Sequence, residues 1–268
     1  MTIEIRPFSN PAAKSYEEFV VIFIDILGFS DAVGQSESNL EKQELLIELF
    51  ELLKQEIKEG KIEEREGYRF IETPMTLFSD SILVPLPIRC ISKFNLYSFA
   101  ASIVEKIQCK LLTQGFLSRG AITIGKAYYD YPICFGPAVI EAVKLEKDKA
   151  KYPRVIFSKA FENYKFYNKV QDIYHSLNDS IGDNIHRDDD NIFYVNYLSL
   201  FILYWKTMEE ARKTQRQINN AVSSKISEDR FTKEDRFTNK VSIKEKIEWF
   251  NKYFEDSIKK NKVYLDYL

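Results

Sequence analysis

The chain has 268 residues, 45% of them hydrophobic and 14% aromatic, which excludes global disorder and provides enough apolar side chains for a sizeable core. Its 38 basic and 40 acidic residues leave a formal net charge of -2, so the composition favours neither a nucleic-acid-binding protein nor a protein bound to an anionic membrane. Three cysteines without a CxxC pair argue against a disulfide scaffold, and the two histidines argue against a zinc site.

We expect a cytoplasmic protein. The N-terminal residues MTIEIRPFSNPAAKS contain no apolar segment of the kind found in secretory signal peptides. The longest apolar run, at 192–205, is interrupted by polar residues and is shorter than the roughly 20 residues of a membrane-spanning helix. The cysteine content also fits a reducing compartment.

The first part of the chain alternates between strand patterns and helix patterns. The run at 19–24 is continuously apolar and rich in Val, Ile and Phe, which predicts a strand buried on both faces. The expected elements, in chain order, are a strand at 19–24, a helix at about 39–59, strands at 68–73 and 76–86, a helix at 96–111, a strand at 119–129, a helix from Gly136 onward and a strand at 154–158.

This order of elements predicts an α+β sandwich, with helices on one face of a mostly antiparallel sheet. The strands at 68–73 and 76–86 are expected to form a hairpin that is joined near Pro74. We place a catalytic domain at residues 1–158 and expect residues 159–268 to form a helical C-terminal extension that packs on this core.

The extension contains one well-signalled helix. Ser242 and Glu245 form a capping box at its start. Before it, the charged segment 223–240 is expected to form a mobile loop, and the acidic run at 187–191 is expected to be a solvated loop, because it lacks the glycine and distal Glu of a calcium-binding loop. The helix carries an apolar stripe for packing on the core or on a partner subunit, made of Ile243, Ile247, Phe250, Phe254 and Ile258.

Two aspartates are the main candidates for chemistry. Asp25 ends the first strand and Asp80 lies inside the predicted hairpin, so adjacent antiparallel strands would bring both carboxylates to one point. Two carboxylates at one point repel each other unless a cation lies between them, and hard oxygen ligands select Mg²⁺ or Mn²⁺. The alternative is that Asp25 caps the next helix and that Asp80 is a turn residue.

The turn after Asp25 favours the metal-site interpretation. Gly28 allows the backbone to approach a ligand closely, and Phe29 and Ser30 begin a helix whose free N–H groups favour a bound phosphate. A metal pair beside a phosphate-binding turn is an arrangement suited to nucleotide phosphate chemistry.

Three stretches of the sequence resemble the motifs of class III nucleotide cyclases, in the same order. FIDILGFSD resembles their FxDixGFT motif, and TLFSDSILV resembles the GDxxxA segment that carries their second metal-binding aspartate. RGAITIGKAYYDYPICFGPAVIEAVKLEKDKA is similar to their RVGIHxG stretch followed by the GxxVNxAxRLE helix. The resemblance covers residues 18–158 and implies a ferredoxin-like βαββαβ catalytic domain.

The same resemblance implies a metal-dependent reaction. Asp25, Asp80 and the backbone carbonyl of Ile26 would bind two ions of Mg²⁺ or Mn²⁺. The ions would lower the pKa of the ribose 3′-hydroxyl and stabilise the charge on the α-phosphate and the leaving pyrophosphate.

Other positions depart from the family pattern. The asparagine and the transition-state arginine of the last helix fall on Ile140 and Lys144. Lys144 supplies charge without bidentate geometry, and Ile140 cannot hydrogen-bond a ribose, so Glu141 and Arg154 are candidates to take over. Arg119 matches the strand arginine of the family, which is expected to reach base or phosphate.

The base-reading positions fall on Thr76 and Ile133, which match neither purine pattern of the family. A pocket of this kind, flanked by Tyr68, would be narrowed for a smaller base. The sequence looks most like the Pycsar pyrimidine cyclases of bacterial anti-phage defence, which make cyclic UMP or cyclic CMP. This resemblance implies a cytoplasmic homodimer with composite active sites that acts on UTP in preference to CTP, and a separate effector protein that senses the product.

Two other interpretations remain open at this point. One is an adenylate or guanylate cyclase with an unusual base pocket. The other is a catalytically inactive, cyclase-like module that binds a nucleotide, which the replacements at Ile140 and Lys144 favour and the presence of both aspartates disfavours.

Overall fold

The structure is a computed structural model, and it describes residues 4–7, 15–56, 61–65, 68–91, 96–164, 166–168, 173–175, 184–199, 212–213, 215–216, 219–220 and 243–265. Within these ranges only the backbone is described at 4–7, 61–65, 68–71, 166–168, 173–175, 243 and 261–265. None of the described helices is long and apolar enough to cross a membrane.

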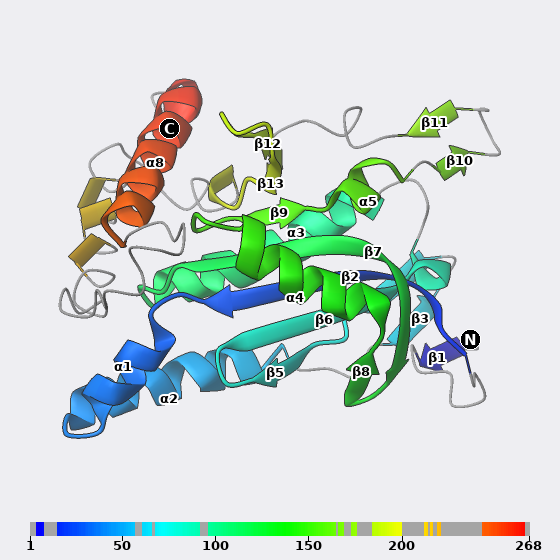
Figure 1. Cartoon of the computed structure of the whole chain (residues 1–268), viewed down its shortest axis with the longest axis horizontal. Helices are drawn as coiled ribbons and strands as arrows, with labels where there is room; N and C mark the ends of the chain where they lie inside the picture. Colours follow the sequence, from blue (N-terminus) through cyan, green and yellow to red (C-terminus); the bar gives the residue numbers. More distant parts are fainter. Residues whose placement is uncertain are drawn as a thin grey trace.

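One sheet forms the centre of the molecule (Figure 1). Every pair of neighbouring strands in it is antiparallel except β7 and β9. The short strand β8 (Ile133–Phe135) pairs with the far end of β7. Along the sheet the strands are β12 (Ile185–Arg187), β13 (Phe193–Val195), β9 (Val155–Phe157), β7 (Ser118–Asp130), β2 (Glu17–Ile26), β6 (Ser81–Pro87) and β5 (Thr76–Phe78).

The observed architecture confirms the predicted fold class, an α+β fold with a mostly antiparallel sheet. The consecutive strands β7, β2, β6 and β5 lie in the order of a ferredoxin-like βαββαβ unit. The two helices of this unit are α2 (Leu40–Lys54) and α3 (Leu96–Thr113). A third helix, α4 (Pro137–Lys149), follows the unit in the chain.

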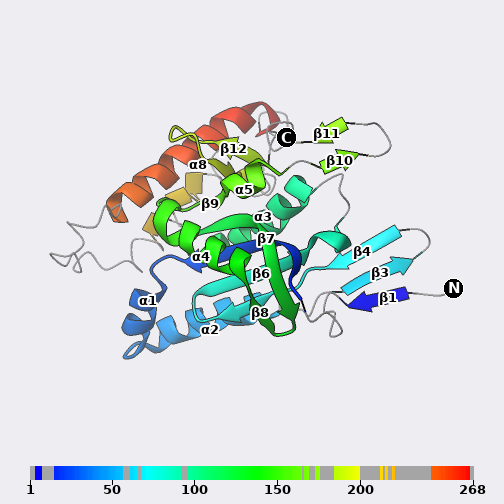
Figure 2. The ribbon, with the colours of Figure 1, turned by 45° about the vertical axis from the view of Figure 1, so that its right-hand side comes forward.

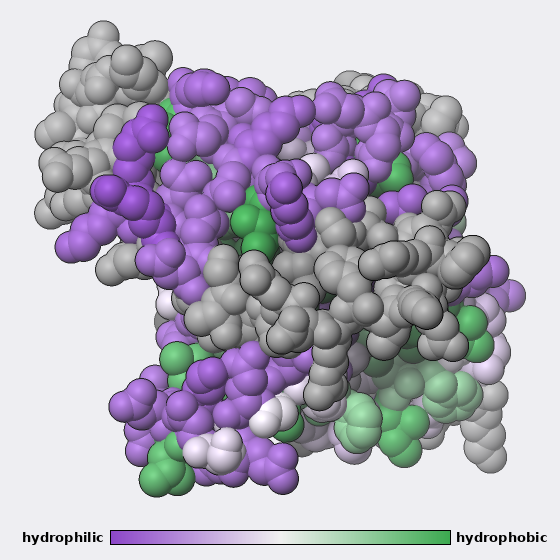
Figure 3. All heavy atoms as spheres, turned by 60° about the vertical axis from the view of Figure 1, so that its left-hand side comes forward, coloured by the Kyte–Doolittle hydropathy of each residue, from purple (hydrophilic) through white to green (hydrophobic). Residues whose placement is uncertain are grey.

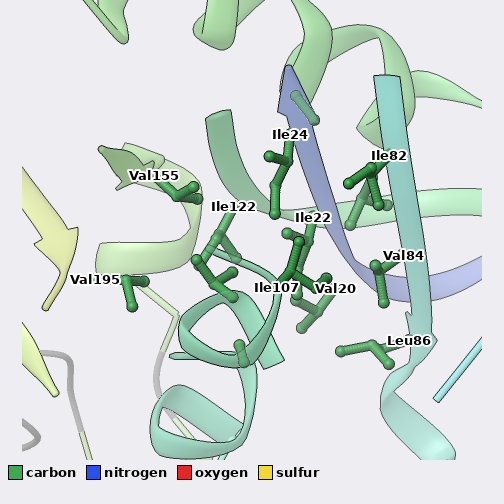
Figure 4. Packing of buried hydrophobic residues seen from close by; sticks show 14 of the residues in the cluster. Val20, Ile22, Ile24, Ile82, Val84, Leu86, Ile107, Ile122, Val155 and Val195 are labelled. Atoms are coloured by element: carbon green, nitrogen blue, oxygen red, sulfur yellow. The ribbon is translucent and has the colours of Figure 1, made fainter. Parts of the chain in front are cut away.

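The helices cover both faces of the sheet, so the expectation of helices on one face is wrong. Side chains alternate between faces along a strand. Val20 and Ile22 of β2 point towards Ile107 of α3 (Figure 4). Helix α3 lies behind the sheet in Figure 1. Helix α4 lies in front of the sheet, where Ala138 packs close to Gly125 of β7.

Burial of β2 on both faces explains its apolar sequence. Residues 19–22 of this strand are between 0% and 2% exposed. Burying each side chain of this size contributes roughly 1.5–3 kcal/mol to folding, so β2 is a large part of the core.

The predicted hairpin of 68–73 with 76–86 is wrong. Strand β4 (Tyr68–Glu72) pairs instead with β3 (Lys61–Arg65), which pairs with β1 (Glu4–Pro7), and these three strands form a separate sheet (Figure 2). The hairpin lies within the second stretch, where β5 turns into β6 at Ser79 and Asp80. Ser79 has a positive φ of 54°, which allows this tight turn.

The helix predicted at about 39–59 is α2, and a separate short helix precedes it. Helix α1 (Phe29–Ser36) begins directly after β2, and Asn39 then caps α2 by accepting a hydrogen bond from the Lys42 N–H at 3.2 Å. Helix α2 ends at Lys54, earlier than predicted, and its buried residues are Leu49 and Leu53.

The C-terminal segment continues the central sheet. Strands β12 and β13 extend it beyond β9, so the boundary proposed at residue 158 falls between strands of one sheet. In α8 (Ile243–Leu265) the predicted stripe is buried at Phe250, Phe254 and Ile258. The Ile243 side chain and the charged segment 223–240 lie outside the described residues. The remaining described elements are η1 (Ile88–Cys90), α5 (Lys159–Glu162), β10 (Phe166–Asn168) and β11 (Ile173–His175).

The acidic run at 187–191 is not simply a solvated loop. Asp188 and Asp190 accept hydrogen bonds from the guanidinium group of Arg154, which is fully buried at the start of β9. Trp249 of α8 donates its indole N–H to Asp188 at 2.8 Å, and its ring lies 5.7 Å from the Arg154 guanidinium carbon. This cluster therefore joins the core sheet to α8.

The substitution Asp188→Asn is expected to lower the free energy of unfolding by about 2 kcal/mol, because it removes one of the two negative charges that pair with the buried Arg154 guanidinium group. Urea denaturation followed by circular dichroism measures this loss. Asp189→Asn is the matched control, since Asp189 is exposed and pairs only with the exposed Lys252 in the described part of the chain. Equal stability of the Asp188→Asn variant and this control would contradict the proposed connection.

Candidate active site

Asp25 lies near the end of β2, between two hydrogen-bonded neighbours. Its register partners are Ser81 in β6 and Arg119 in β7. Because Ile22 and Ile24 face α3, the alternation along the strand directs the Asp25 side chain to the opposite face, where α4 lies. The Asp25 side chain is 23% exposed, so it lies at the boundary between core and solvent. Its strand is held on both edges by β6 and β7.

Asp80 lies beside this position. It forms the turn between β5 and β6, and its carbonyl accepts a hydrogen bond from the Ile26 N–H at 3.0 Å. The turn is thus attached to the residue that follows Asp25. Burial raises the pKa of Asp25, the negative charge of Asp80 raises it further, and the positive charge of Arg119 opposes both effects.

The chemistry of this pair fits a hard divalent cation. Two half-exposed carboxylates at the end of a sheet repel each other, and a cation between them would remove that repulsion. Among the described residues no group of three or more His, Cys, Asp or Glu side chains is arranged to hold a metal ion. A hard cation held by two carboxylates, with the Ile26 carbonyl as the expected third protein ligand, would keep several water ligands, as Mg²⁺ sites commonly do.

The turn after β2 presents backbone N–H groups beside the carboxylates. Gly28 has φ 73° and ψ 13°, a left-handed conformation that favours glycine, and it precedes the first turn of α1. The Phe29 side chain is buried against the ring of Phe50 at a centroid distance of 5.4 Å, so only its backbone remains for a ligand. Ser30 is exposed. Asp31 in the first turn adds a negative charge that a bound phosphate would have to tolerate.

Glu146 of α4 also lies at this site, and the sequence analysis missed it. The buried residues Ala138, Ala142 and Glu146 recur at a spacing of four, so they form the face of α4 that packs on the sheet. Two alanines allow close packing, and the third position places a carboxylate under the helix. A charged residue on an otherwise small and buried helix face is the signal that was available.

Arg119 connects Glu146 with Asp25. The Arg119 Nε atom is 2.7 Å from Glu146 Oε1 and 3.5 Å from Asp25 Oδ2. Both Nε and Oε1 are buried, and within the described residues neither atom has a partner in hydrogen-bond geometry, because the N–H does not point at the oxygen. The contact is therefore an ion pair with poor hydrogen-bond geometry.

The electrostatics of Glu146 follow from this arrangement. Burial raises the pKa of Glu146 to about 7, the charges of Asp25 and Asp80 add to the increase, and Arg119 opposes it. Lys246 of α8 lowers the pKa of Asp25, so α8 also contributes to the field at the site.

Lys144 is not brought to Asp25 and Asp80 within one chain. It is exposed on the outer side of α4, two residues from the buried Glu146. Ile140, one turn before it, is 71% exposed on the same side. Arg154 lies elsewhere, since it is fully buried and donates to Asp188 and Asp190, so it has no access to a substrate at this site.

The residues predicted to read the base or to flank its pocket lie on three different strands. Thr76 begins β5, and its hydroxyl group lies 3.5 Å from the Leu83 carbonyl, to which it donates. Ile133 begins β8 and is 57% exposed. Tyr68 begins β4, and its side chain lies outside the described residues. The structure brings together Asp25, Asp80 and Arg119, and it leaves the base-reading residues without a shared contact among the described residues.

No protein-family model and no curated protein matches the chain. Among solved structures, the guanylyl cyclase domain of the RhoGC fusion protein from the aquatic fungus Blastocladiella emersonii is 15% identical, with 68% of this chain and 96% of that chain covered and a TM-score of 0.41. A bacterial light-regulated adenylyl cyclase is 12% identical, with 79% and 99% covered and a TM-score of 0.38.

The raised pKa of Glu146 predicts a pH-dependent loss of stability in metal-free buffer. The folded-state pKa of about 7 exceeds the ordinary value of 4.5, so the unfolded chain releases its proton first. The contribution of Glu146 is fully present below pH 4.5 and is lost as the pH rises towards 7. The stability of Glu146→Gln relative to the unmodified protein should therefore increase between pH 5 and pH 7.5.

Urea denaturation in EDTA at a series of pH values measures this difference. Asp148→Asn, which removes an exposed carboxylate from the same helix, is the control and should show no such trend. A constant difference in stability between Glu146→Gln and the unmodified protein across this range would refute the pKa assignment.

Proposed function

We propose that this protein is a nucleotide cyclase that requires Mg²⁺ or Mn²⁺ and converts UTP, or alternatively CTP, to the 3′,5′-cyclic nucleotide and pyrophosphate. The main support is the placement of Asp25 and Asp80 together at the end of β2, beside the glycine turn that begins α1. The order of the sequence motifs adds support, because these two aspartates stand where the class III motifs carry their metal ligands.

In this reaction the residues around Asp25 would bind the metal ions and the triphosphate and would stabilise the developing negative charge. Asp25, Asp80 and the Ile26 carbonyl would hold two metal ions, which supply charge that stabilises the reacting α-phosphate and the leaving pyrophosphate. The N–H groups at 28–30 would bind the triphosphate at the start of α1. Arg119 would add positive charge at the same point, and cyclisation within one bound nucleotide then depends mainly on positioning.

We propose that the active form is a head-to-tail homodimer with composite sites. Lys144 is exposed on the outer side of α4, where it would reach the metal site of a partner subunit rather than its own. Figure 3 shows that apolar side chains gather at the lower right of one face, whereas hydrophilic side chains dominate its lower left and upper parts. Large apolar side chains that a dimer would cover are exposed on β5, β8 and α4, namely Phe78, Ile133, Phe135, Ile140 and Val143.

The proposal of a pyrimidine base depends on the chemistry of two positions. Thr76 and Ile133 replace the charged and polar side chains that read purines in class III cyclases, and a pocket flanked by Tyr68 would be narrowed for a smaller base. The resemblance to Pycsar enzymes further suggests a cytoplasmic role in anti-phage signalling, with the cyclic nucleotide sensed by a separate effector protein.

A second candidate function is nucleotide binding without turnover. The exposed Ile140 and Lys144 stand at the positions of the ribose-binding asparagine and the transition-state arginine, and neither reproduces the original hydrogen bonds. A purine cyclase with an unusual pocket is the third candidate.

Incubation of the purified protein with each of ATP, GTP, CTP and UTP separately, in the presence of Mn²⁺, distinguishes these functions. We expect a cyclic pyrimidine nucleotide, with UTP preferred, identified by mass spectrometry. Cyclic AMP or cyclic GMP alone would contradict the pyrimidine proposal, and binding without any product would favour the inactive module.

Asp25→Ala should reduce product formation by a factor of about 100 or more while the fold is retained, because it removes a direct metal ligand. Asp130→Ala, which removes a carboxylate at the far end of β7, is the matched control and should keep its activity. Full activity of the Asp25→Ala variant would rule out the metal-site assignment.

A further inference from the structure

Arg119 is positioned between two carboxylates that compete for it. Asp25 is its cross-strand partner, and Glu146 approaches it from α4. The Arg119 Nε atom is closer to Glu146, at 2.7 Å, than to Asp25, at 3.5 Å. The Nε atom therefore lies nearer to the helix carboxylate, while Arg119 still acts on Asp25, because its charge and its side-chain hydrogen bonding lower the pKa of that carboxylate.

The positions of the three groups make this competition strong. The Glu146 side chain is only 8% exposed, whereas those of Asp25 and Arg119 are 23% and 24% exposed. Charges interact more strongly where water is excluded, so the buried Glu146 attracts Arg119 effectively. A carboxylate at this depth, with one oxygen that has no hydrogen bond in the described part of the chain, has Arg119 as its nearest described cation.

The competition for Arg119 affects whether the Asp25 oxygens are free to bind a metal ion. An arginine that paired fully with Asp25 would occupy its oxygens with two parallel hydrogen bonds and would exclude a metal ion from them. The observed 3.5 Å separation leaves the carboxylate without such a pair.

We propose that Glu146 is a positioning residue that holds Arg119 away from Asp25 and thereby keeps the Asp25 carboxylate available to a divalent cation. The inference depends on the proposed function, because it assumes that Asp25 binds a metal ion. It assigns Glu146 no contact with the ion or with the nucleotide. Its effect is transmitted by Arg119.

Direct binding of Mn²⁺ without nucleotide tests the proposal, with free Mn²⁺ measured by electron paramagnetic resonance. At about pH 8, above the Glu146 pKa of about 7, Glu146→Gln keeps the shape of the side chain and removes its charge, so Arg119 is expected to move to Asp25. We expect the affinity for Mn²⁺ to fall about tenfold, the scale of one interaction between contacting charged residues. Asp148→Asn removes an exposed charge from the same helix and should leave the affinity unchanged.

The double variant separates positioning from a direct electrostatic effect. In an Arg119→Met background, Glu146→Gln should change the affinity by less than about twofold, because the residue that it controls is gone. An equal loss of affinity in both backgrounds would overturn the proposal, since Glu146 would then act on the ion directly. Thermal unfolding of each variant checks that the fold is retained.

The same experiment distinguishes failure of this inference from failure of the proposed function. If Asp25→Ala abolishes Mn²⁺ binding and Glu146→Gln leaves it unchanged, the positioning role is wrong and the metal site stands. If Asp25→Ala binds Mn²⁺ as well as the unmodified protein does, the metal site and the positioning role are both wrong.

Discussion

Strand β2 is hydrogen-bonded to β6 on one edge and to β7 on the other, and the ladder with β6 runs to Asp25 while the ladder with β7 runs to Ile26. This double pairing fixes the register of three strands at one point. It places Arg119 directly beside Asp25, and the Ile26 N–H holds the turn at Asp80 against the same strand end. The apolar residues 19–22 hold β2 in place, because they are buried under α3 and α4. The geometry of the candidate site is thus a consequence of packing in the core.

The second determinant of the site is its balance of charge. Asp25, Asp80 and Glu146 are close enough for their charges to affect one another, and Arg119 is the cation in contact with two of them. Such a site is stabilised by additional positive charge, which metal ions would provide.

Much of the fold follows from local patterns in the sequence. The apolar run before Asp25 predicts a central strand, and the glycines at 28, 115 and 136 mark the ends of elements, each with a positive φ. The pairing of β4 was predicted wrongly, because the short strands β3 and β1 carry weak patterns and the hairpin between β3 and β4 was therefore not recognised.

Local sequence patterns also predicted the two aspartates of the site, but not Glu146 beside them. Asp25 could be found because it ends an apolar strand pattern, and Asp80 because it lies inside the predicted hairpin. Glu146 carries only the weaker signal of a charged residue that follows Ala138 and Ala142 at a spacing of four. The role of Arg154 was also hidden, since its partners Asp188 and Asp190 lie more than 30 residues away in a run that looks solvated. Sequence patterns reveal charged residues, whereas tertiary packing decides which charges meet.

The central claim is that Asp25 and Asp80 together form one metal site that binds a nucleoside triphosphate. The most direct measurement compares the purified protein with its Asp80→Asn variant, each incubated with Mn²⁺ and either UTP or CTP, and identifies the products by mass spectrometry. The account predicts a cyclic pyrimidine nucleotide from the unmodified protein and none from the folded variant. Equal product formation by the variant would contradict it.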